Sequence, residues 1–196
     1  MWKFKTPGIP DEEFERLEDV PITKEEVRVI QISKARLKPG YVVYDIGCGS
    51  GSISVEAAYQ IESSGKIYAI DFDQKAIELT KKNLKKFEIS NVTTILGNAK
   101  EKIPDLPQAD AIFIGGTGGD TKEILELCNN KIKSGGRIII GIILIETLFS
   151  VLELIKKLDF SSVDITQVTI SKSRKTTTGT MMLARNPVTI ISITKN

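Results

Sequence analysis

The sequence contains no histidine, which excludes catalytic sites that use an imidazole base and removes the commonest metal ligand. Its two cysteines, Cys48 and Cys128, have no metal-binding spacing and are too few for a disulfide framework, so both are expected to be packing residues. No apolar run reaches the roughly 18 residues that span a bilayer, and no signal-peptide pattern opens the chain. We therefore expect a soluble, cytoplasmic protein with no metal site and no membrane partner.

An excess of charge of one sign is also missing. The 27 basic and 25 acidic residues give a net charge of +2, too small to indicate a nucleic-acid partner. With 196 residues, of which 41% are hydrophobic, the chain can bury the core of one globular domain.

The strongest motif is a glycine-rich turn that follows a short apolar strand. The run YVVYDIGCGSG begins with the predicted buried strand 41–46 and continues into Gly47, Gly49 and Gly51. These glycines permit a sharp turn and the close approach of a ligand to the backbone. The helix expected from Ser52 would direct free N–H groups at that ligand. The pattern predicts a nucleotide-type cradle.

The spacing of the glycines and two acidic residues indicate which nucleotide. The glycines follow G-x-G-x-G, whereas a dinucleotide-binding turn reads G-x-G-x-x-G. Asp45, at the strand end, would repel a pyrophosphate but suits an ammonium or sulfonium group. Asp71 ends the next predicted strand, where a carboxylate can accept both ribose hydroxyls. These features predict S-adenosylmethionine, although a plain strand-to-helix turn with Asp71 as a helix N-cap is the alternative.

Strand, glycine loop, helix, strand and acid occur in the order found in class I S-adenosylmethionine-dependent methyltransferases, which this part of the chain resembles. We expect an α/β, Rossmann-like fold with a seven-stranded, mostly parallel sheet, an antiparallel edge hairpin and helices on both faces. The single domain, 1–196, would comprise an N-terminal arm and helix (1–40), a cofactor-binding core (41–143) and a last helix with a C-terminal hairpin (144–196). Predicted helices cover residues 23–38, 52–61, 73–87, 121–131 and 146–158, and predicted strands cover 41–46, 66–71, 92–96, 109–114, 137–143, 161–170 and 181–193.

Further candidate cofactor contacts surround this motif. Cys48 and Ser50 lie inside the glycine loop. Thr23 and a glutamate three residues later form a predicted capping box, and the Thr23 hydroxyl could also reach the cofactor. In methyltransferases of this type the residues after the third strand border the adenine, so Asn98 could bind the base and Ala99 could offer its backbone N–H. Many relatives have Asp in place of Asn98, and a plain turn is the alternative for both residues.

The candidate substrate contacts follow the fourth and fifth strands. Gly115, Gly116, Thr117, Gly118 and Gly119 form a loop at the carboxyl edge of the sheet, where ligands bind in open α/β folds. Its glycines permit close approach of a bulky ligand and present N–H groups to anionic oxygens, unless the loop is only a flexible connection. The N/D-P-P-Y/F motif of enzymes that methylate adenine or glutamine amides is absent here.

Charged residues of the last third of the chain provide further candidates. Glu146 and Thr147 follow the fifth strand. Glu146 is the best-placed carboxylate for proton transfer, or else a first-turn residue favoured by the helix dipole. Four cations cluster in or near the predicted hairpin connection: Lys172, Arg174, Lys175 and Arg185. They form either a solvated tip or an electropositive rim for a carboxylate-bearing substrate, to which we assign Arg174 and Arg185.

Segments outside the glycine loop resemble one family in particular. PGIPDEEF and PITKEEVR in the arm, the GGTGG loop, GIILIET and the closing GTMMLARNPV are similar to the decarboxylating precorrin C15-methyltransferases of cobalamin biosynthesis. The resemblance covers nearly the whole chain. It implies a tetrapyrrole substrate, cobalt-precorrin-6B, with methylation at C15 and decarboxylation of the C12 acetate, S-adenosylmethionine as methyl donor, and a homotetramer. It also suggests cofactor contacts at Thr23, Gly47 to Gly51, Asp71 and Ala99.

Two alternatives stay open at this point. One is a methyltransferase of similar fold that acts on RNA or on protein isoaspartate, although the single tryptophan and four tyrosines give little sign of a stacking platform. The other is a non-catalytic module that binds S-adenosylmethionine without turnover.

Overall fold

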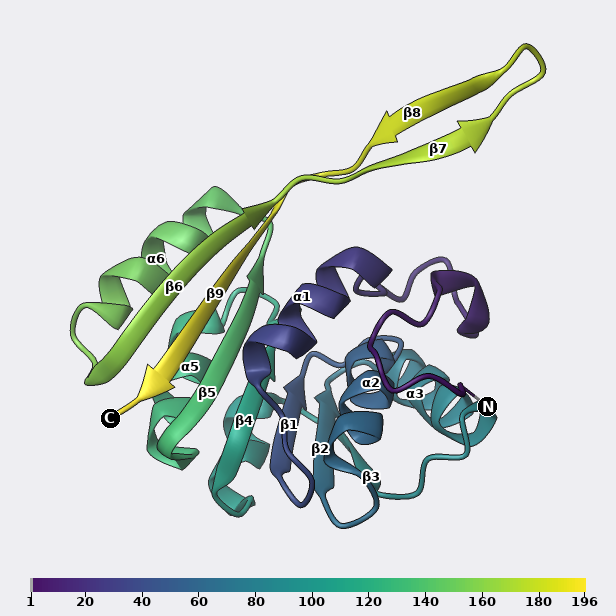
Figure 1. Cartoon of the computed structure of the whole chain (residues 1–196). Helices are drawn as coiled ribbons and strands as arrows, with labels where there is room; N and C mark the ends of the chain where they lie inside the picture. Colours follow the sequence, from purple (N-terminus) through teal and green to yellow (C-terminus); the bar gives the residue numbers. More distant parts are fainter. Residues whose placement is uncertain (1) are drawn as a thin grey trace.

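A seven-stranded sheet runs through the centre of the computed structural model, which describes residues 2–196 (Figure 1). Its strand order is β3-β2-β1-β4-β5-β9-β6. The first five strands in this order pair in parallel, and β9 is antiparallel to both of its neighbours. This confirms the predicted mostly parallel α/β sheet. The strands are β1 (Val42–Ile46), β2 (Lys66–Asp71), β3 (Val92–Leu96), β4 (Ala109–Ile114), β5 (Ile132–Ile142), β6 (Phe160–Val168) and β9 (Val188–Lys195).

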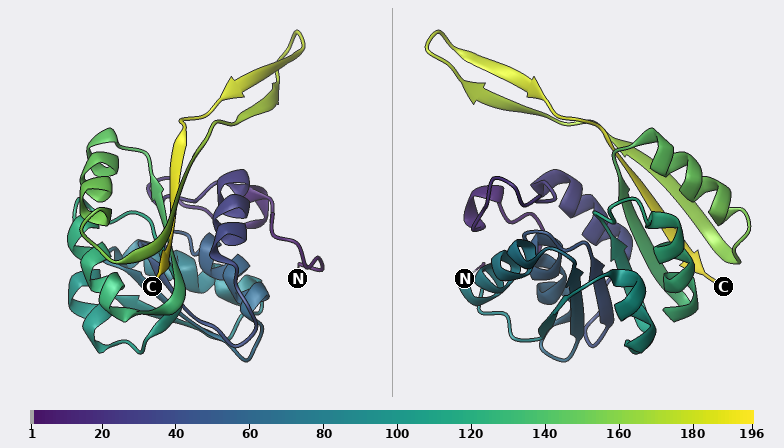
Figure 2. Two further views of the ribbon diagram at one scale, coloured as in Figure 1. Left: turned by 60° about the vertical axis from the view of Figure 1, so that its left-hand side comes forward. Right: turned by 180° about the vertical axis from the view of Figure 1, so that it is seen from behind.

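Helices cover both faces of the sheet (Figure 2). Alternate residues of each buried strand point to opposite faces, so Val43 packs against the α1 and α2 side while Tyr44 packs against the α5 and α6 side. The first face carries α1 (Glu25–Ala35), α2 (Ser52–Ile61) and α3 (Gln74–Lys86). The second carries α4 (Ala99–Lys102), a short 3₁₀ turn at Ile103–Asp105, α5 (Thr121–Lys131) and α6 (Ile145–Ile155). A second 3₁₀ turn, Asp11–Glu13, lies in the N-terminal arm and contacts α1.

The C-terminal region differs from the sequence prediction. Residues 181–193 do not form one strand, because β8 (Thr180–Ala184) ends before Pro187 and β9 begins after it. Proline cannot donate a backbone hydrogen bond to a sheet, so it interrupts the strand pattern. β7 (Ser171–Lys175) and β8 form a separate antiparallel pair that projects from the body (Figure 1).

The fifth strand also differs from its predicted bounds. It begins at Ile132 rather than at residue 137, and its register with β4 shifts between Ala109 and Ala111. Residues 133–136 form this irregularity, which the glycines at 135 and 136 permit.

A buried arginine fixes the N-terminal arm to the body. Arg28, on α1, is fully buried. Its Nε donates to Glu56 Oε1 at 2.6 Å, its Nη1 donates to Asp11 Oδ1 at 3.2 Å, and its other donors reach the carbonyls of Ile9 and Thr23. One guanidinium therefore joins α1, α2 and residues 8–23 of the arm.

The predicted capping box at Thr23 and Glu26 is wrong. Helix α1 begins at Glu25, and its N-cap residue, Lys24, makes no side-chain capping bond. Instead, Asp11 Oδ1 accepts the N–H of Glu25 at 3.0 Å. The cap comes from a residue of the arm that is distant in sequence, so local spacing could not reveal it.

Replacing Arg28 with Met would leave Asp11 and Glu56 buried without the cation that they share. Breaking a buried ion pair by removing one partner costs about 3 to 5 kcal/mol, so the free energy of unfolding in a urea titration should fall by about that amount. As a control, Lys86→Met removes an exposed pair with Glu15 and should cost about 1 kcal/mol or less. Equal effects of the two substitutions would contradict the role of Arg28.

Candidate active site

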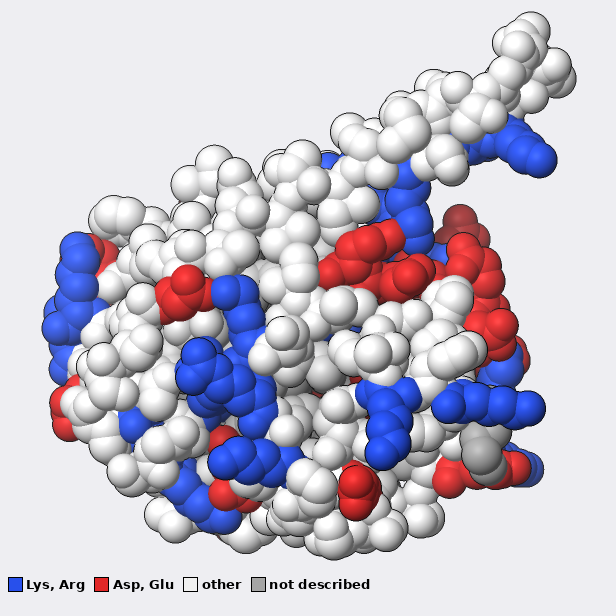
Figure 3. Space-filling model, viewed as in Figure 1, with Lys and Arg blue, Asp and Glu red and all other residues white. Residues whose placement is uncertain are grey.

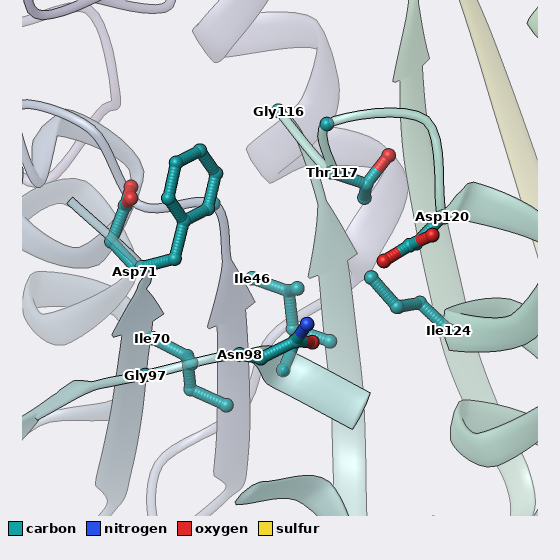
Figure 4. A pocket seen from close by; sticks show the side chains of 13 residues that line it. Ile46, Ile70, Asp71, Gly97, Asn98, Gly116, Thr117, Asp120 and Ile124 are labelled. Carbon is teal, nitrogen blue, oxygen red and sulfur yellow. The ribbon is translucent and has the colours of Figure 1, made fainter. Parts of the chain in front are cut away.

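A cavity of about 190 Å³ lies at the carboxyl edge of the sheet, beyond the ends of β1, β2 and β4 (Figure 4). Its floor is apolar and includes Ile46, Ile70 and Ile124. Its walls come from four connections: the glycine loop, the end of β2, the β3–α4 turn and the β4–α5 loop. The lining brings together seven of the residues predicted from the sequence: Gly47, Asp71, Asn98, Ala99, Gly116, Thr117 and Gly118.

Each glycine of the loop is packed against a different part of the protein. A Cβ atom on Gly47 would lie 2.4 Å from the Gly116 carbonyl oxygen, and one on Gly49 would lie 2.6 Å from the Pro21 carbonyl oxygen. A Cβ on Gly51 would lie 2.8 Å from the Thr80 side chain. All three glycines also have positive φ. They are therefore required by the β4–α5 loop, the arm and α3, as well as by any ligand.

The backbone donors of the glycine loop are already used inside the protein. All five N–H groups from Gly47 to Gly51 have acceptors at 2.8 to 3.1 Å: the carbonyls of Ile70, Pro21 and Cys48 and the carboxylate of Asp71. The loop itself offers a ligand close approach rather than free donors.

Asp71 joins the glycine loop to the start of α3. Its Oδ2 accepts the N–H of Gly49 at 2.9 Å, and its Oδ1 accepts the N–H of Asp73 at 3.0 Å. The N-cap of α3 is Asp73, whose side chain accepts the N–H of Lys75, so the alternative interpretation of Asp71 as an N-cap is wrong. Each carboxylate oxygen can accept a further bond, and Asp71 lines the cavity.

Asp45 lies beneath the glycine loop and does not line the cavity. Its Oδ2 accepts the hydroxyl of Ser54, on α2, at 2.6 Å. Burial, assisted by the negative charge of Asp71, raises the pKa of Asp45 to about 6. The carboxylate therefore holds α2 against the strand end, and a cation above the loop would favour its charged form.

Five other predicted cofactor contacts lie outside the cavity lining, and two of them, Gly49 and Gly51, are the loop glycines described above. Cys48 packs with Ala69 and Ile77, and burial raises the pKa of its thiol, which fits the packing role expected for it. Ser50 has a buried Oγ with no hydrogen-bond partner among residues 2–196. Thr23 contributes its carbonyl to Arg28.

The β4–α5 loop is tied to its surroundings at both ends. The N–H of Gly115 donates to the carbonyl of Ile46 at 2.8 Å, and the hydroxyls of Thr117 and Thr121 are hydrogen-bonded. Asp120, which follows Gly119, forms an ion pair at 2.7 Å with Lys100 on the β3–α4 side. The loop is therefore anchored across the cavity.

Sequence reasoning missed two residues of the cavity wall. Phe72 directly follows Asp71, lines the cavity and is 66% exposed, and a Cβ on Gly118 would lie 3.8 Å from its ring. Asp120 directly follows the glycines of the β4–α5 loop and points toward the cavity (Figure 4). Adjacency to the two predicted motifs is the signal that could have found them.

The six remaining predicted residues lie outside the cavity lining: Gly115 and Gly119 of the β4–α5 loop, and Glu146, Thr147, Arg174 and Arg185. Glu146 and Thr147 are in the first turn of α6, where Glu146 is exposed. Arg174 is exposed on β7. Arg185 lies 3.6 Å from Glu26, with which it is paired.

Acidic residues of α1 neutralise half of the basic cluster. Lys172 pairs with Glu25 at 3.2 Å and with Glu26 at 2.6 Å, and Arg185 shares the second of these partners. Figure 3 shows acidic and basic side chains in contact where the hairpin meets the body. Of the four cations, only Arg174 and Lys175 are without such a pair in the described residues. Among the described residues, the predicted electropositive rim therefore has two unpaired cations instead of four.

Within residues 2–196 no group of three or more Cys, Asp or Glu side chains could hold a metal ion. In the same range no helix has the length and apolar character needed to cross a membrane.

The strand order, the glycine loop after β1 and the acid that ends β2 define the class I methyltransferase fold. Residues 13–195 match the model of the precorrin methyltransferase domain, and the chain belongs to this family.

Individual relatives agree with this assignment. The chain is 46% identical over 193 residues to a probable cobalt-precorrin-6B C(15)-methyltransferase (decarboxylating) of Saccharolobus solfataricus, covering 97% of each chain. It is 39% identical, with a TM-score of 0.89, to the crystal structure of a precorrin 8W decarboxylase from Methanobacterium thermoautotrophicum, covering 94% of this chain and 98% of that one. A precorrin-6y C5,15-methyltransferase from Geobacter metallireducens matches with a TM-score of 0.89 and 36% identity, covering 97% and 98%.

The raised pKa of Asp45 predicts how stability depends on pH. The pKa of Asp45 is about 6 in the folded protein and 3.8 for an ordinary aspartate, so the folded protein binds the proton of this carboxyl more tightly than the unfolded chain does. The free energy of unfolding should therefore fall as the pH rises from about 4 to about 6. Asp45→Asn should remove this fall and make the ligand-free protein more stable at pH 8, by up to about 3 kcal/mol. Urea titrations at pH 4.5, 6 and 8 measure the free energy of unfolding of the wild type and of the variant. Asp105→Asn, an exposed control, should keep the wild-type profile.

The contact between the two glycine loops makes Gly47→Ala disruptive. The added methyl would overlap the backbone of Gly116, so the β4–α5 loop must move and the cavity must change shape. We expect a loss of about 1 to 3 kcal/mol of stability. Gly179→Ala is the matched control, because nothing lies within 4 Å of its added Cβ. Thermal unfolding that is unchanged in both variants would show that the packing constraint at Gly47 is absent.

Proposed function

We propose that the chain is an S-adenosylmethionine-dependent methyltransferase that methylates C15 of cobalt-precorrin-6B and decarboxylates its C12 acetate to give cobalt-precorrin-8. The observation that carries this proposal is the match to relatives of that name along 97% of the chain, at 46% identity, together with the cavity beside the glycine loop. Membership of the precorrin methyltransferase family favours a tetrapyrrole over RNA or protein isoaspartate.

The cavity has the chemical groups that S-adenosylmethionine requires. Asp71 can accept bonds from the two ribose hydroxyls, and the apolar floor suits a purine face. Asn98 and Ala99 lie where the base would meet polar groups. Gly47, without a side chain, permits close approach of the methionine portion, which carries the methyl group on a sulfonium. The ligand's positive charge would also stabilise the ionised form of Asp45.

The main contribution of the protein to this reaction would be to position the methyl donor and the substrate carbon. In methyl transfer to carbon, an electron pair of the substrate carbon forms the new bond while the bond from sulfur to the methyl carbon breaks, and the sulfur leaves as a neutral thioether. Holding the reacting atoms about 3 to 3.5 Å apart and aligned contributes roughly 7 to 11 kcal/mol in favourable cases. The tetrapyrrole itself can supply the nucleophilic carbon and take up the electron pair released with carbon dioxide. A catalytic histidine is not required.

The predicted substrate contacts would act on the substrate's periphery. We assign Gly115 to Gly119 to the ring edge nearest the methyl donor, and Arg174 and Arg185 to its carboxylates. Arg185 would have to exchange its pairing with Glu26 for a substrate carboxylate. Thr147 would contact the substrate beside Glu146, at the first turn of α6.

The exposed apolar residues of β8 support a homotetramer. Met181, Met182 and Leu183 are exposed on the projecting strand, where apolar side chains favour association. The homotetramer and the cytoplasmic location both stay predictions.

Anaerobic incubation with cobalt-precorrin-6B and labelled S-adenosylmethionine, followed by product mass, tests the proposal. The expected product has gained one methyl group and lost carbon dioxide. Methyl gain alone would remove the decarboxylation from the proposal. If the cofactor binds but the tetrapyrrole does not react, the proposed function is wrong, and RNA, protein isoaspartate or binding without turnover become the alternatives to test.

Glu146→Gln tests the proton-carrier role proposed for Glu146. The substitution removes the titrating group but keeps the shape of the side chain, so proton-dependent decarboxylation should slow by about 10² or more while methylation changes less. Single-turnover analysis of both products measures this. Glu153→Gln, on the same helix and paired with Lys156, is the control. If both rates of Glu146→Gln equal those of the wild type, the proton-carrier role is wrong.

A further inference from the structure

The two walls of the cavity differ in the hydrogen-bonding groups that they can offer to a purine edge. The Watson–Crick edge of adenine combines a 6-amino donor with a ring-nitrogen acceptor, so a selective site needs both an acceptor and a donor. The carboxylates that line the cavity are Asp71 and Asp120, which lie on opposite sides of it (Figure 4). Asp71 already accepts two backbone N–H groups and belongs to the side of the glycine loop.

Asn98 is poorly suited to act as the acceptor. Its Oδ1 accepts the backbone N–H of Lys100 at 2.9 Å and thereby caps α4. The amide is then oriented with its oxygen toward the helix, and its NH₂ group remains as a donor. The β3–α4 turn therefore offers donors to a base more readily than it offers a side-chain acceptor.

Asp120 is free to act as that acceptor. It is the N-cap residue of α5, yet its side chain makes no capping bond. The carboxylate instead pairs through Oδ2 with Lys100 Nζ at 2.7 Å, and among the described residues no other side chain is bonded to it. This pair links α4 to the end of the β4–α5 loop, which fixes the direction of the carboxylate and leaves Oδ1 available.

We propose that Asp120 accepts a hydrogen bond from the 6-amino group of the cofactor's adenine, with Lys100 as the residue that orients it. The inference deepens the proposed function, on which it rests for the identity of the cofactor. A 6-oxo purine would present an oxygen to this carboxylate in place of an N–H donor. Asp120 is thus a specificity residue that separates adenine from hypoxanthine.

Isothermal titration with S-adenosylhomocysteine and S-inosylhomocysteine tests the role. The wild type should bind the adenine compound at least about tenfold more tightly, since a site built to bond an N–H donor rejects an analogue that lacks it. Asp120→Ala should lower the ratio of the two dissociation constants by about threefold or more, leaving only the preference that the donors of the β3–α4 turn contribute at the ring nitrogen. Asp120→Asn keeps the shape of the side chain and can turn either its amide oxygen or its amide nitrogen to the base. This variant should therefore also have a lower ratio of the two dissociation constants than the wild type.

Glu123→Ala is the matched control. It removes an acidic side chain three residues further along α5 that also acts on Lys100, but it does not line the cavity. Its selectivity ratio should equal that of the wild type. Circular dichroism of each variant establishes that it is folded before titration.

The ratio of the two dissociation constants distinguishes a role of Asp120 in base selectivity from a role in maintaining the structure of the cavity. If Asp120→Ala weakens both compounds equally and keeps the wild-type ratio, or if the wild type shows no preference, the proposal for Asp120 is overturned while the cofactor assignment stands. If the wild type binds neither compound, the proposed cofactor is wrong and the role of Asp120 fails with it.

Discussion

The packing of the glycine loop against the backbone of other segments is the constraint on which the site depends. Gly47 admits the β4–α5 loop, Gly49 admits the arm at Pro21, and Gly51 admits α3. Because the N–H groups of the loop are bonded to acceptors inside the protein, the fold itself holds the conformation of the loop. A preformed loop loses little entropy when a ligand binds, which favours both affinity and alignment of the reacting atoms.

Buried charges extend this constraint to the edges of the molecule. Arg28 holds the arm against α1 and α2, and the arm places the Pro21 carbonyl over the glycine loop, where it accepts the N–H of Ser50. Asp11, bonded to Arg28, also lies 3.9 Å from Arg185 at the base of the hairpin. A continuous set of contacts therefore leads from the projecting hairpin to the glycine loop. The basic residues at the hairpin base, Lys172 and Arg185, stabilise this connection through their pairs with Glu25, Glu26 and Asp11.

The sheet, the helices and the glycine motif could be predicted because their signals are local. Strand periodicity and the turn after Ile46 depend on neighbouring residues alone. The errors fall where a distant residue decides the outcome. Asp11 caps α1 across the arm, and the acids of α1 neutralise Arg185. Asp120 could have been found because it directly follows the glycines of the β4–α5 loop, but its ion pair with Lys100, twenty residues earlier in the chain, is not contained in a linear pattern.

A crystal structure of the protein with S-adenosylhomocysteine tests the central claim most directly. The account predicts ribose hydroxyls bonded to Asp71, the base between Phe72 and the β4–α5 loop, and the glycine loop unchanged from its ligand-free conformation. A ligand bound away from the carboxyl edge of the sheet, or a loop that refolds to bind it, would contradict the account.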